Sequence, residues 1–347
     1  MVYTQRQSYI VLLAAALLFC IAGSARGLVL HPGGEPNLAT WTDRPSDNVV
    51  GRWGHTACCV AVSRNCVVTT RHQAGSLNTQ VEIAGGRYSV SDIWEHETAD
   101  LRLARLYGAN LTDFVELFEG RFEAGRQVVI GGFGAASGAL LENHGVVYGY
   151  DWDSSSPAKL RWGTNRIERT EDNKSLEELV SDVVIADFDG LGEGKSTVYE
   201  CTVGGHDSGG GWFVKTAGDW RLAGLSRAID VHFEQGHEND PNYSLWQAWF
   251  RDRGNPGAAR PDYLDAVRIS SYAGWIKQRI PAVRPGDLTG DDLVDMSDLV
   301  VFGHYWGSRE CRYPDWCAGA DSEPDGDIDW RDMVEFSNNW LEPEEGY

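Results

Sequence analysis

The chain has 347 residues, of which 42% are hydrophobic, and 14 are tryptophan, a composition that favours folded globular domains over disorder. Its length suits one sizeable domain together with a smaller one. The formal net charge of −21 argues against nucleic acid as a partner, because phosphate binding needs patches of Lys and Arg.

The N-terminus has the features of a secretory signal peptide. Arg6 precedes an apolar run over residues 9–22, and small residues follow, so we place cleavage near Ala25. An uncleaved membrane anchor is the alternative, but the run is short for the roughly 30 Å of hydrocarbon in a bilayer. Cys20 does not indicate a lipoprotein, since the bulky Phe19 precedes it. We therefore expect a secreted or cell-surface associated protein without a transmembrane anchor after cleavage.

Short β-rich runs separated by glycine extend from about residue 49 to residue 148. Examples are Cys66–Thr70, Gln80–Ile83 and Gln127–Ile130. Many short strands with glycine turns predict a β-sandwich or a β-barrel. Two more polar stretches, 154–195 and 230–261, lack this pattern, and we expect functional insertions or mobile loops there.

Six cysteines remain once the signal peptide is removed. They are Cys58, Cys59, Cys66, Cys201, Cys311 and Cys317. An even number in a secreted chain favours disulfides, and Cys311 and Cys317 are close together and alone in their region. We expect Cys66 to pair with Cys58 or Cys59, which leaves Cys201 for the other. A zinc site is the alternative, but the spacings match no familiar zinc pattern.

A serine lies in the glycine-rich stretch Gly205-His206-Asp207-Ser208-Gly209-Gly210. Such a stretch can be a simple turn, and a serine hydroxyl needs a base, itself held by a third group, to act as a nucleophile. Two upstream residues are candidates for these partners. His72 ends an apolar strand after two threonines, and Asp100 opens the alternating segment Asp100–Leu106.

These motifs resemble, in order, those of the trypsin/chymotrypsin family of serine peptidases, as do Gly131-Gly132-Phe133-Gly134 and the segment 267–276. The resemblance covers roughly residues 49–281 and implies two packed six-stranded β-barrels with the site between them. It implies that Ser208 is the nucleophile, His72 the general base and then acid, and Asp100 the orienting carboxylate. Polypeptides would be the substrates, and catalysis would need no cofactor. The backbone N–H groups of His206 and Ser208 would form the oxyanion hole.

The chain departs from the family pattern at His206 and in its expected mode of activation, and its specificity pocket can be placed only by alignment. His206 replaces a glycine, and histidine adopts φ > 0 only uncommonly, so a catalytically inactive binding module is the alternative function. Asp207 matches the residue that pairs with a newly released N-terminus in the family. Here Val49-Val50-Gly51, the faint match to that N-terminus, begins only 23 residues before His72, so we expect an internal partner for Asp207. Thr202 and Val203 align with the specificity pocket, and the absence of an acid there predicts an uncharged or small substrate side chain.

An acidic C-terminal region follows a helical pattern over 271–280 and the prolines Pro281 and Pro285. From residue 285 onward the chain has 17 acidic residues and 3 arginines, a net charge of −14. Two 12-residue segments, 287–298 and 321–332, repeat with a 34-residue offset, and each precedes a hydrophobic helical stretch. A solvated acidic linker is the alternative, but the register kept through both loops and helices argues against it.

Calcium prefers oxygen ligands, which a 12-residue loop presents from positions 1, 3, 5, 7, 9 and 12. The candidate ligands are Asp287, Thr289, Asp291, the Leu293 carbonyl, Asp295 and Asp298 in the first loop, and Asp321, Glu323, Asp325, the Asp327 carbonyl, Asp329 and Asp332 in the second. Gly326 suits the sharp turn at position 6, where the first loop has Asp292. Aspartate at position 12 and one helix after each loop resemble an EF-hand-like type I dockerin. That resemblance implies docking onto a cohesin-bearing protein through Met296-Ser297 and Trp330-Arg331.

Four segments are therefore predicted. They are a signal peptide over 1–25, a trypsin-like peptidase domain over 26–281, a linker over 282–286 and a dockerin-like domain over 287–343. The expected fold class is mainly β, with two packed six-stranded barrels and a small α-helical domain. The expected function is that of a secreted serine endopeptidase with a calcium-dependent docking module.

Overall fold

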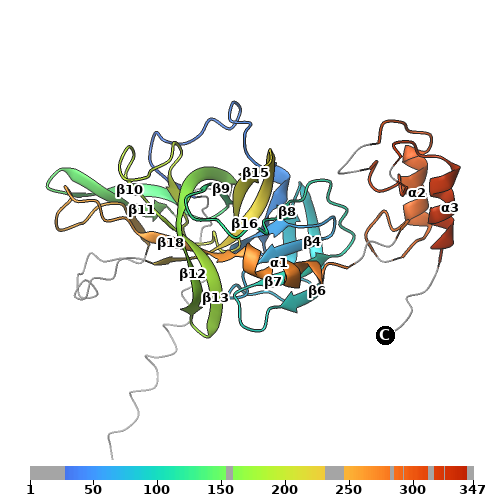
Figure 1. Ribbon diagram of the computed structural model, residues 1–347, viewed down its shortest axis with the longest axis horizontal. Coiled ribbons are helices and arrows are strands. Elements are labelled where there is room, and N and C mark those ends of the chain that lie inside the picture. The colour runs from blue at the N-terminus through green and yellow to red at the C-terminus, as the bar shows by residue number, and fades with distance from the viewer. Residues whose placement is uncertain are drawn as a thin grey trace, which may run out of the picture.

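The computed structural model describes residues 28–153, 159–230, 246–281, 285–291, 293–311, 316–323 and 325–341. The expected signal peptide, residues 282–284 of the expected linker, and Asp292 lie outside this range. Figure 1 shows a large β-rich body with a small helical region at one end. No helix among the described residues is long and apolar enough to cross a membrane.

The first barrel closes from six short antiparallel strands. They are β2 (Val50–Trp53), β3 (Ala57–Ala61), β4 (Cys66–Thr69), β5 (Gln80–Ile83), β6 (Gly86–Glu95) and β7 (Arg102–Leu106). They pair in the order β2-β3-β4-β7-β6-β5, and pairing of β5 with β2 closes the ring. One of its core clusters includes the buried residues Val67, Val81, Ala104 and Leu106. The glycine-punctuated β pattern of the sequence thus forms a barrel in this region.

The second barrel is larger, and its strands are longer. It contains β9 (Gln127–Gly132), β12 (Arg161–Leu176), β13 (Leu179–Asp187), β15 (Gly211–Thr216), β16 (Asp219–Asp230) and β18 (Tyr263–Arg268). The order β15-β9-β12-β13-β18-β16 is closed by pairing of β16 with β15, while β8 (Glu116–Leu117) adds to β16 in parallel. Two closed six-stranded barrels confirm the expected fold class.

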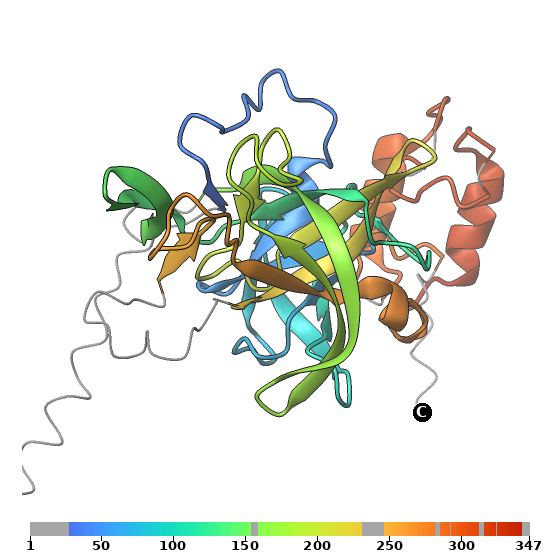
Figure 2. The ribbon, with the colours of Figure 1, turned by 60° about the vertical axis from the view of Figure 1, so that its left-hand side comes forward.

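The expectation of a loop over residues 154–195 is wrong. Most of this stretch is the hairpin of β12 and β13, which turns between Leu176 and Leu179 (Figure 2). The half of β12 near the turn is largely exposed, which explains its polar sequence, whereas Val183–Ala186 of β13 are fully buried in the barrel. In the other polar stretch, β17 (Gln247–Trp249) is a strand, and residues 231–245 lie outside the described range.

Smaller elements border the second barrel. β1 (Val29–Leu30) pairs with β14 (Cys201–Thr202), and β10 (Ala136–Asn143), β11 (Val146–Asp153) and β17 form a three-stranded sheet. The 3-10 turn η1 (Asp47–Val49) leads into β2. The expected closing helix is present as α1 (Ile269–Lys277).

The C-terminal region packs around two helices, α2 (Met296–Tyr305) and α3 (Trp330–Asn338). The rings of Phe302 and Phe336 meet in its core with centroids 5.2 Å apart. The region also contacts the first barrel, because Asn110 Nδ2 donates to the Leu288 carbonyl at 2.6 Å. Gly290 has a φ of +77°, and a Cβ there would lie 2.4 Å from the Ala109 carbonyl, so a larger residue would disturb this contact.

The disulfide between Cys311 and Cys317 confirms one expected pairing. The pairings expected for Cys58, Cys59, Cys66 and Cys201 are wrong, since these four cysteines are buried thiols that form no disulfide. Cys58 and Cys59 are neighbours in β3, so their side chains point to opposite faces of the strand. Cys59, Cys66 and Cys201 lie in three different hydrophobic clusters, which keeps their sulfur atoms apart.

Candidate functional site

His72 and Asp100 come together at one end of the first barrel. His72 follows β4, and Asp100 precedes β7, the strand that pairs with β4. The Asp100 side chain is fully buried, and its Oδ2 lies 2.6 Å from His72 Nδ1. Its Oδ1 accepts the backbone N–H of His72 at 2.7 Å. Both carboxylate oxygens therefore hold the histidine, one through its ring and one through its backbone.

Ser208 reaches the same histidine from the other barrel. It lies in the loop between β14 and β15, and its Oγ is 2.9 Å from His72 Nε2. One imidazole thus bridges a buried carboxylate and a half-buried hydroxyl across the boundary between the barrels. This is the arrangement in which a hydroxyl can lose its proton to a base that a carboxylate orients.

The loop that carries Ser208 is fastened to the first barrel. The backbone N–H of Cys58 donates to the Ser208 carbonyl at 2.7 Å, and Cys58 Sγ lies 3.4 Å from the His206 carbonyl. Gly209 has a φ of +81°, and a Cβ there would lie 2.1 Å from the Cys58 carbonyl. Burial raises the pKa of the Cys58 thiol well above its usual value, so this cysteine remains a neutral packing residue. Gly209 is therefore a steric requirement of the contact between the Ser208 loop and the first barrel.

His206 adopts the backbone conformation that a glycine would have taken easily. Its φ is +75°, and its Nδ1 donates to the Thr56 carbonyl at 3.1 Å, a contact that fixes the ring. Within the described residues, the backbone N–H groups of His206 and Ser208 donate no hydrogen bond. Both donors therefore remain available for an external acceptor, as an oxyanion hole requires.

Asp207 is fully buried beside Ser208 and has internal partners. Its Oδ1 accepts the N–H of Gly134 at 2.6 Å, and its Oδ2 accepts the N–H of Gly204 at 2.8 Å. Burial raises the pKa of Asp207 to about 7, opposed by these two N–H groups and by the charge of Arg161. The Asp207 carboxylate therefore ties the glycine-rich turn after β9 to the Ser208 loop.

A cavity of about 430 Å³ opens beside Ser208. Of the two residues predicted for the specificity pocket, Val203 lines this cavity, whereas Thr202 is buried in β14 and does not line it. Two indoles, Trp152 and Trp246, also line the cavity and contact each other edge to face with centroids 5.5 Å apart. Neither tryptophan could be assigned to the site from the sequence, because both are more than 35 residues from Ser208 and belong to no motif.

The described cavity lining contains no acidic side chain. Arg227 is its one arginine, and its guanidinium is held by Asp265 through two hydrogen bonds of 2.7 and 2.9 Å. Lys174 lies 3.0 Å from the same carboxylate. Asp265 therefore fixes the Arg227 guanidinium in place, and the cavity presents mainly aromatic and aliphatic surface.

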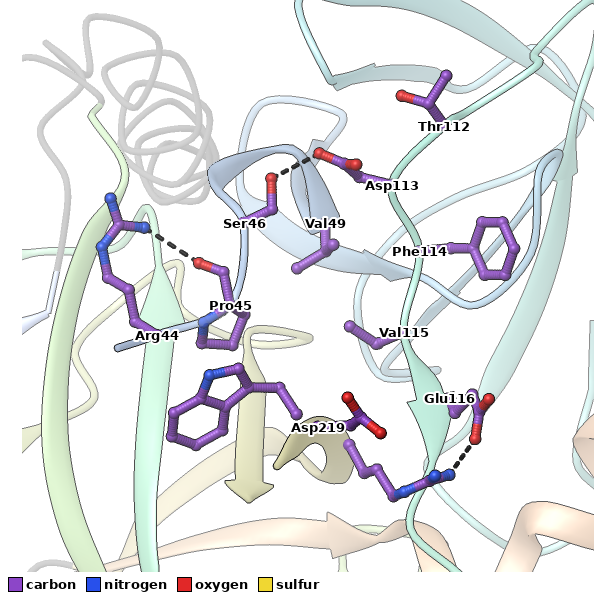
Figure 3. A pocket seen from close by; sticks show the side chains of 12 residues that line it. Arg44, Pro45, Ser46, Val49, Thr112, Asp113, Phe114, Val115, Glu116 and Asp219 are labelled. Atoms are coloured by element: carbon purple, nitrogen blue, oxygen red, sulfur yellow. Dashed lines mark hydrogen bonds and ion pairs between the residues drawn. The ribbon is translucent and has the colours of Figure 1, made fainter. Parts of the chain in front are cut away.

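A second cavity, of about 320 Å³, lies apart from this site (Figure 3). Its walls come from residues 44–49, from residues 112–116 between the barrels, and from residues 219–221. Polar groups in the wall already bond to one another, as between Ser46 Oγ and Asp113 Oδ2 at 2.6 Å and between Arg221 and Glu116. None of the three residues His72, Asp100 and Ser208 lines it.

The first acidic loop brings three of its expected ligands together. Carboxylate oxygens of Asp287, Asp291 and Asp298 lie within 4.8 Å of one another. Thr289 Oγ1 donates to Asp298 Oδ1 at 3.0 Å, so its oxygen adjoins the cluster. Asp295 instead caps α2, accepting the N–H of Ser297 at 2.7 Å. An all-oxygen donor set with three close carboxylates fits a hard divalent cation such as calcium.

The second loop forms hydrogen bonds equivalent to those of the first, but its described carboxylates do not lie as close together. Asp332 Oδ2 accepts the N–H of Asp329, as Asp298 Oδ2 does for Asp295, both at 2.9 Å. The described carboxylates of this loop form no group within 4.8 Å. Arg331 pairs instead with Asp325 at 2.7 Å and with Asp329 at 3.1 Å. The remaining expected ligands lie in their loops as the sequence places them, namely Leu293, Asp321, Glu323 and Asp327.

Comparisons with known proteins give a limited result. No protein-family model matches the chain, and no curated protein matches it. Among solved structures, neuropsin, a serine protease expressed in the limbic system of mouse brain, is similar at 16% sequence identity with a TM-score of 0.44. That match covers 68% of this chain and 96% of the neuropsin chain.

Proposed function

We propose that the chain is a secreted serine endopeptidase that carries a calcium-dependent docking module at its C-terminal end. The observation that carries the enzymatic part is the continuous contact from Asp100 through His72 to Ser208, with distances of 2.6 and 2.9 Å. Secretion rests on the signal-like N-terminus, which lies outside the described residues.

In the proposed reaction, Ser208 Oγ attacks the carbonyl carbon of a peptide bond while His72 Nε2 takes the hydroxyl proton. The negative charge that develops on the carbonyl oxygen is met by the N–H groups of His206 and Ser208, and such a donor contributes roughly 3–4 kcal/mol. His72 then gives its proton to the leaving amine, which departs and leaves an acyl-enzyme. Water, deprotonated by His72, hydrolyses that ester and restores Ser208. Asp100 keeps the imidazole in the required tautomer throughout.

Labelling with a fluorophosphonate probe tests this proposal, because the probe reacts with an activated serine hydroxyl. Wild-type protein should acquire the label at Ser208, identified by peptide mass spectrometry, and Ser208→Ala should acquire none. Ser63→Ala, which alters a serine in another turn of the first barrel, should label as the wild type does. If correctly folded wild-type protein stays unlabelled, the alternative of an inactive binding module replaces the enzyme.

The cavity beside Ser208 supports a preference for an uncharged, apolar side chain on the acyl side of the cleaved bond. Its indole walls offer large apolar area, and a basic substrate side chain would find no carboxylate among the described lining residues. Profiling cleavage on a peptide library tests this preference. A clear preference for Lys or Arg at that position would contradict it.

The proposed docking module is supported by a repeated pair of exposed apolar residues. Met296 and Val300 on α2 are 62% and 70% exposed, and Trp330 and Val334 on α3 are 66% and 47% exposed. Residues four apart share one face of a helix, so each helix presents an apolar pair at the same place in its repeat. Such a surface fits a protein partner, which the dockerin resemblance identifies as a cohesin-bearing protein.

The calcium proposal rests on the carboxylates of the first loop. Asp287, Asp291 and Asp298 would hold the ion, with Thr289 and the Leu293 carbonyl as further oxygen donors. The bound ion would offset the repulsion among the three carboxylates and so stabilise the loop before α2. Isothermal titration with calcium tests binding, and the absence of any calcium heat in chelator-treated, refolded protein would contradict it.

A further inference from the structure

Two backbone N–H groups of the loop that carries Asp100 donate to side chains. The loop joins β6 to β7, whose last pair is Glu95 with Arg102. Inside the loop, the N–H of Ala99 donates to His96 Nδ1 at 3.0 Å, and the N–H of Asp100 donates to Ser181 Oγ at 2.9 Å. A buried N–H without an acceptor is costly, so these two side chains stabilise the shape of the loop.

Ser181 belongs to the other barrel. It is the third residue of β13, in the hairpin whose polar sequence predicts a loop. Ser181 and Asp100 are both fully buried, although 81 residues separate them. Beside this bond, the N–H of Val180 donates to the Thr98 carbonyl at 2.9 Å. Two consecutive residues of β13 therefore form hydrogen bonds with the Asp100 loop across the boundary between the barrels.

The hairpin is itself held in place from behind. The N–H of Asp182 donates to the Tyr272 hydroxyl at 2.8 Å, and Tyr272 belongs to α1. The ring of Tyr272 also meets the ring of His96 edge to face, with centroids 4.9 Å apart. The closing helix therefore supports the loop in two ways, through the hairpin and through His96.

We propose that Ser181 is a positioning residue that fixes Asp100 relative to Ser208. This rests on the proposed function, and Ser181 contacts neither His72 nor the cavity beside Ser208 in any described hydrogen bond or lining. Both Asp100 oxygens are committed to His72, so a small rotation of the Asp100 backbone displaces both contacts together. Ser208 and Ser181 both belong to the second barrel. The hydrogen bond from the Asp100 N–H to Ser181 Oγ therefore fixes the position of the Asp100 carboxylate relative to Ser208.

Three substitutions separate positioning from general stability. Ser181→Ala removes the acceptor, Ser181→Thr keeps it on a residue that strands favour, and Ser63→Ala is the matched control. The control removes a serine oxygen that accepts the N–H of Cys66 at 3.0 Å in the same first barrel, away from Asp100. We expect the second-order rate constant of fluorophosphonate labelling to fall about tenfold in Ser181→Ala. In Ser181→Thr the rate constant should be within about threefold of wild type. In Ser63→Ala it should not change. With a peptide substrate, the loss should appear in kcat and leave KM nearly unchanged.

The proposal fails if folded Ser181→Ala labels at the wild-type rate, or if Ser181→Thr is as slow as Ser181→Ala. Should Ser181→Ala not fold, Ser181→Cys takes its place, since a thiol is a weaker acceptor, and a wild-type rate in that variant overturns the proposal. An unlabelled wild-type protein would instead overturn the proposed function, so the two failures are distinct.

Discussion

Buried carboxylates are treated differently in the barrels and in the C-terminal region. In the barrels, Asp100 faces a histidine, Asp207 faces two backbone N–H groups, and Asp265 faces an arginine and a lysine. In the first acidic loop, three carboxylates face one another within 4.8 Å. Each of these barrel acids lies apart from the other two, whereas the three acids of the loop repel one another, and the proposed calcium ion would offset that repulsion. This contrast predicts that the two regions respond differently to the same perturbations.

The largest effect is expected for Asp100→Asn, which tests the barrel side of the contrast. The amide cannot hold the histidine in the required tautomer, so kcat/KM should fall about 10⁴-fold while the fold is retained. Progress curves with a peptide substrate and circular dichroism measure the two quantities. Asp113→Asn, which alters an acid of the Figure 3 cavity away from the triad, serves as the control and should keep its activity. A loss below tenfold in Asp100→Asn would remove Asp100 from the proposed mechanism.

Calcium removal should affect the C-terminal region and spare the barrels. A ligand present at 100 times its Kd stabilises the folded state by about 2.7 kcal/mol, so hydrogen exchange in residues 287–341 should accelerate strongly in chelator. Exchange in β12 and β13 should not change. Equal exchange in residues 287–341 with calcium and with chelator would contradict the prediction.

Asp291→Asn gives a sharper test of calcium binding, because it should stabilise the first loop without calcium and destabilise it with calcium. Without calcium, the substitution removes one of three repelling charges and should slow exchange in the first loop. With calcium, it removes a ligand charge and should weaken affinity about tenfold. Asp327→Asn alters an exposed acid outside the close cluster and should do neither. A uniform loss of stability in both conditions would indicate a structural role for Asp291 alone.

The free energy of unfolding should fall as pH rises, because of Glu200, which lies next to β14. Burial raises the pKa of Glu200 to about 8, opposed by hydrogen bonds from Thr197. Because the folded-state pKa lies above the unfolded value near 4.5, folding retains a proton, and its stabilisation is lost as pH rises from about 5 to 8. The largest slope that one such group gives is about 1.4 kcal/mol per pH unit. Urea unfolding of Glu200→Gln should show a shallower fall in stability over this range.

Glu177→Gln provides the matched control for this measurement, since Glu177 is exposed at the turn of the β12–β13 hairpin. It should keep the wild-type slope. An unchanged slope in Glu200→Gln would mean that other groups, such as Asp207, account for the whole pH dependence.

The sequence predicted the fold class and three residues that the fold brings together, but it did not predict several structural details around them. His72, Asp100 and Ser208 were identifiable because each lies next to a strand end or turn with a recognisable neighbourhood. The β12–β13 hairpin was missed because the outer half of β12 is solvent-exposed and reads as a loop. Ser181 and the two tryptophans of the cavity could not be found, since their roles depend on contacts between segments far apart in the chain. The cysteine pairings failed for the same reason, because cysteine count does not say which core cluster each residue enters.

The smallest effect is expected for His206→Gly, at the position where the Ser208 loop departs from the trypsin-like pattern that its sequence resembles. Histidine at a φ of +75° costs about 1 kcal/mol, and its bond to the Thr56 carbonyl offsets a similar amount, so stability should change little. The proposed oxyanion donor is the backbone N–H, which glycine also has, and kcat/KM should therefore stay within about threefold of wild type. Thr56 contributes only a carbonyl, so Thr56→Ser leaves the bond intact and is the control. A loss of more than tenfold in His206→Gly would show that the imidazole itself takes part in the reaction, and that the left-handed turn serves to place that ring as well as the N–H.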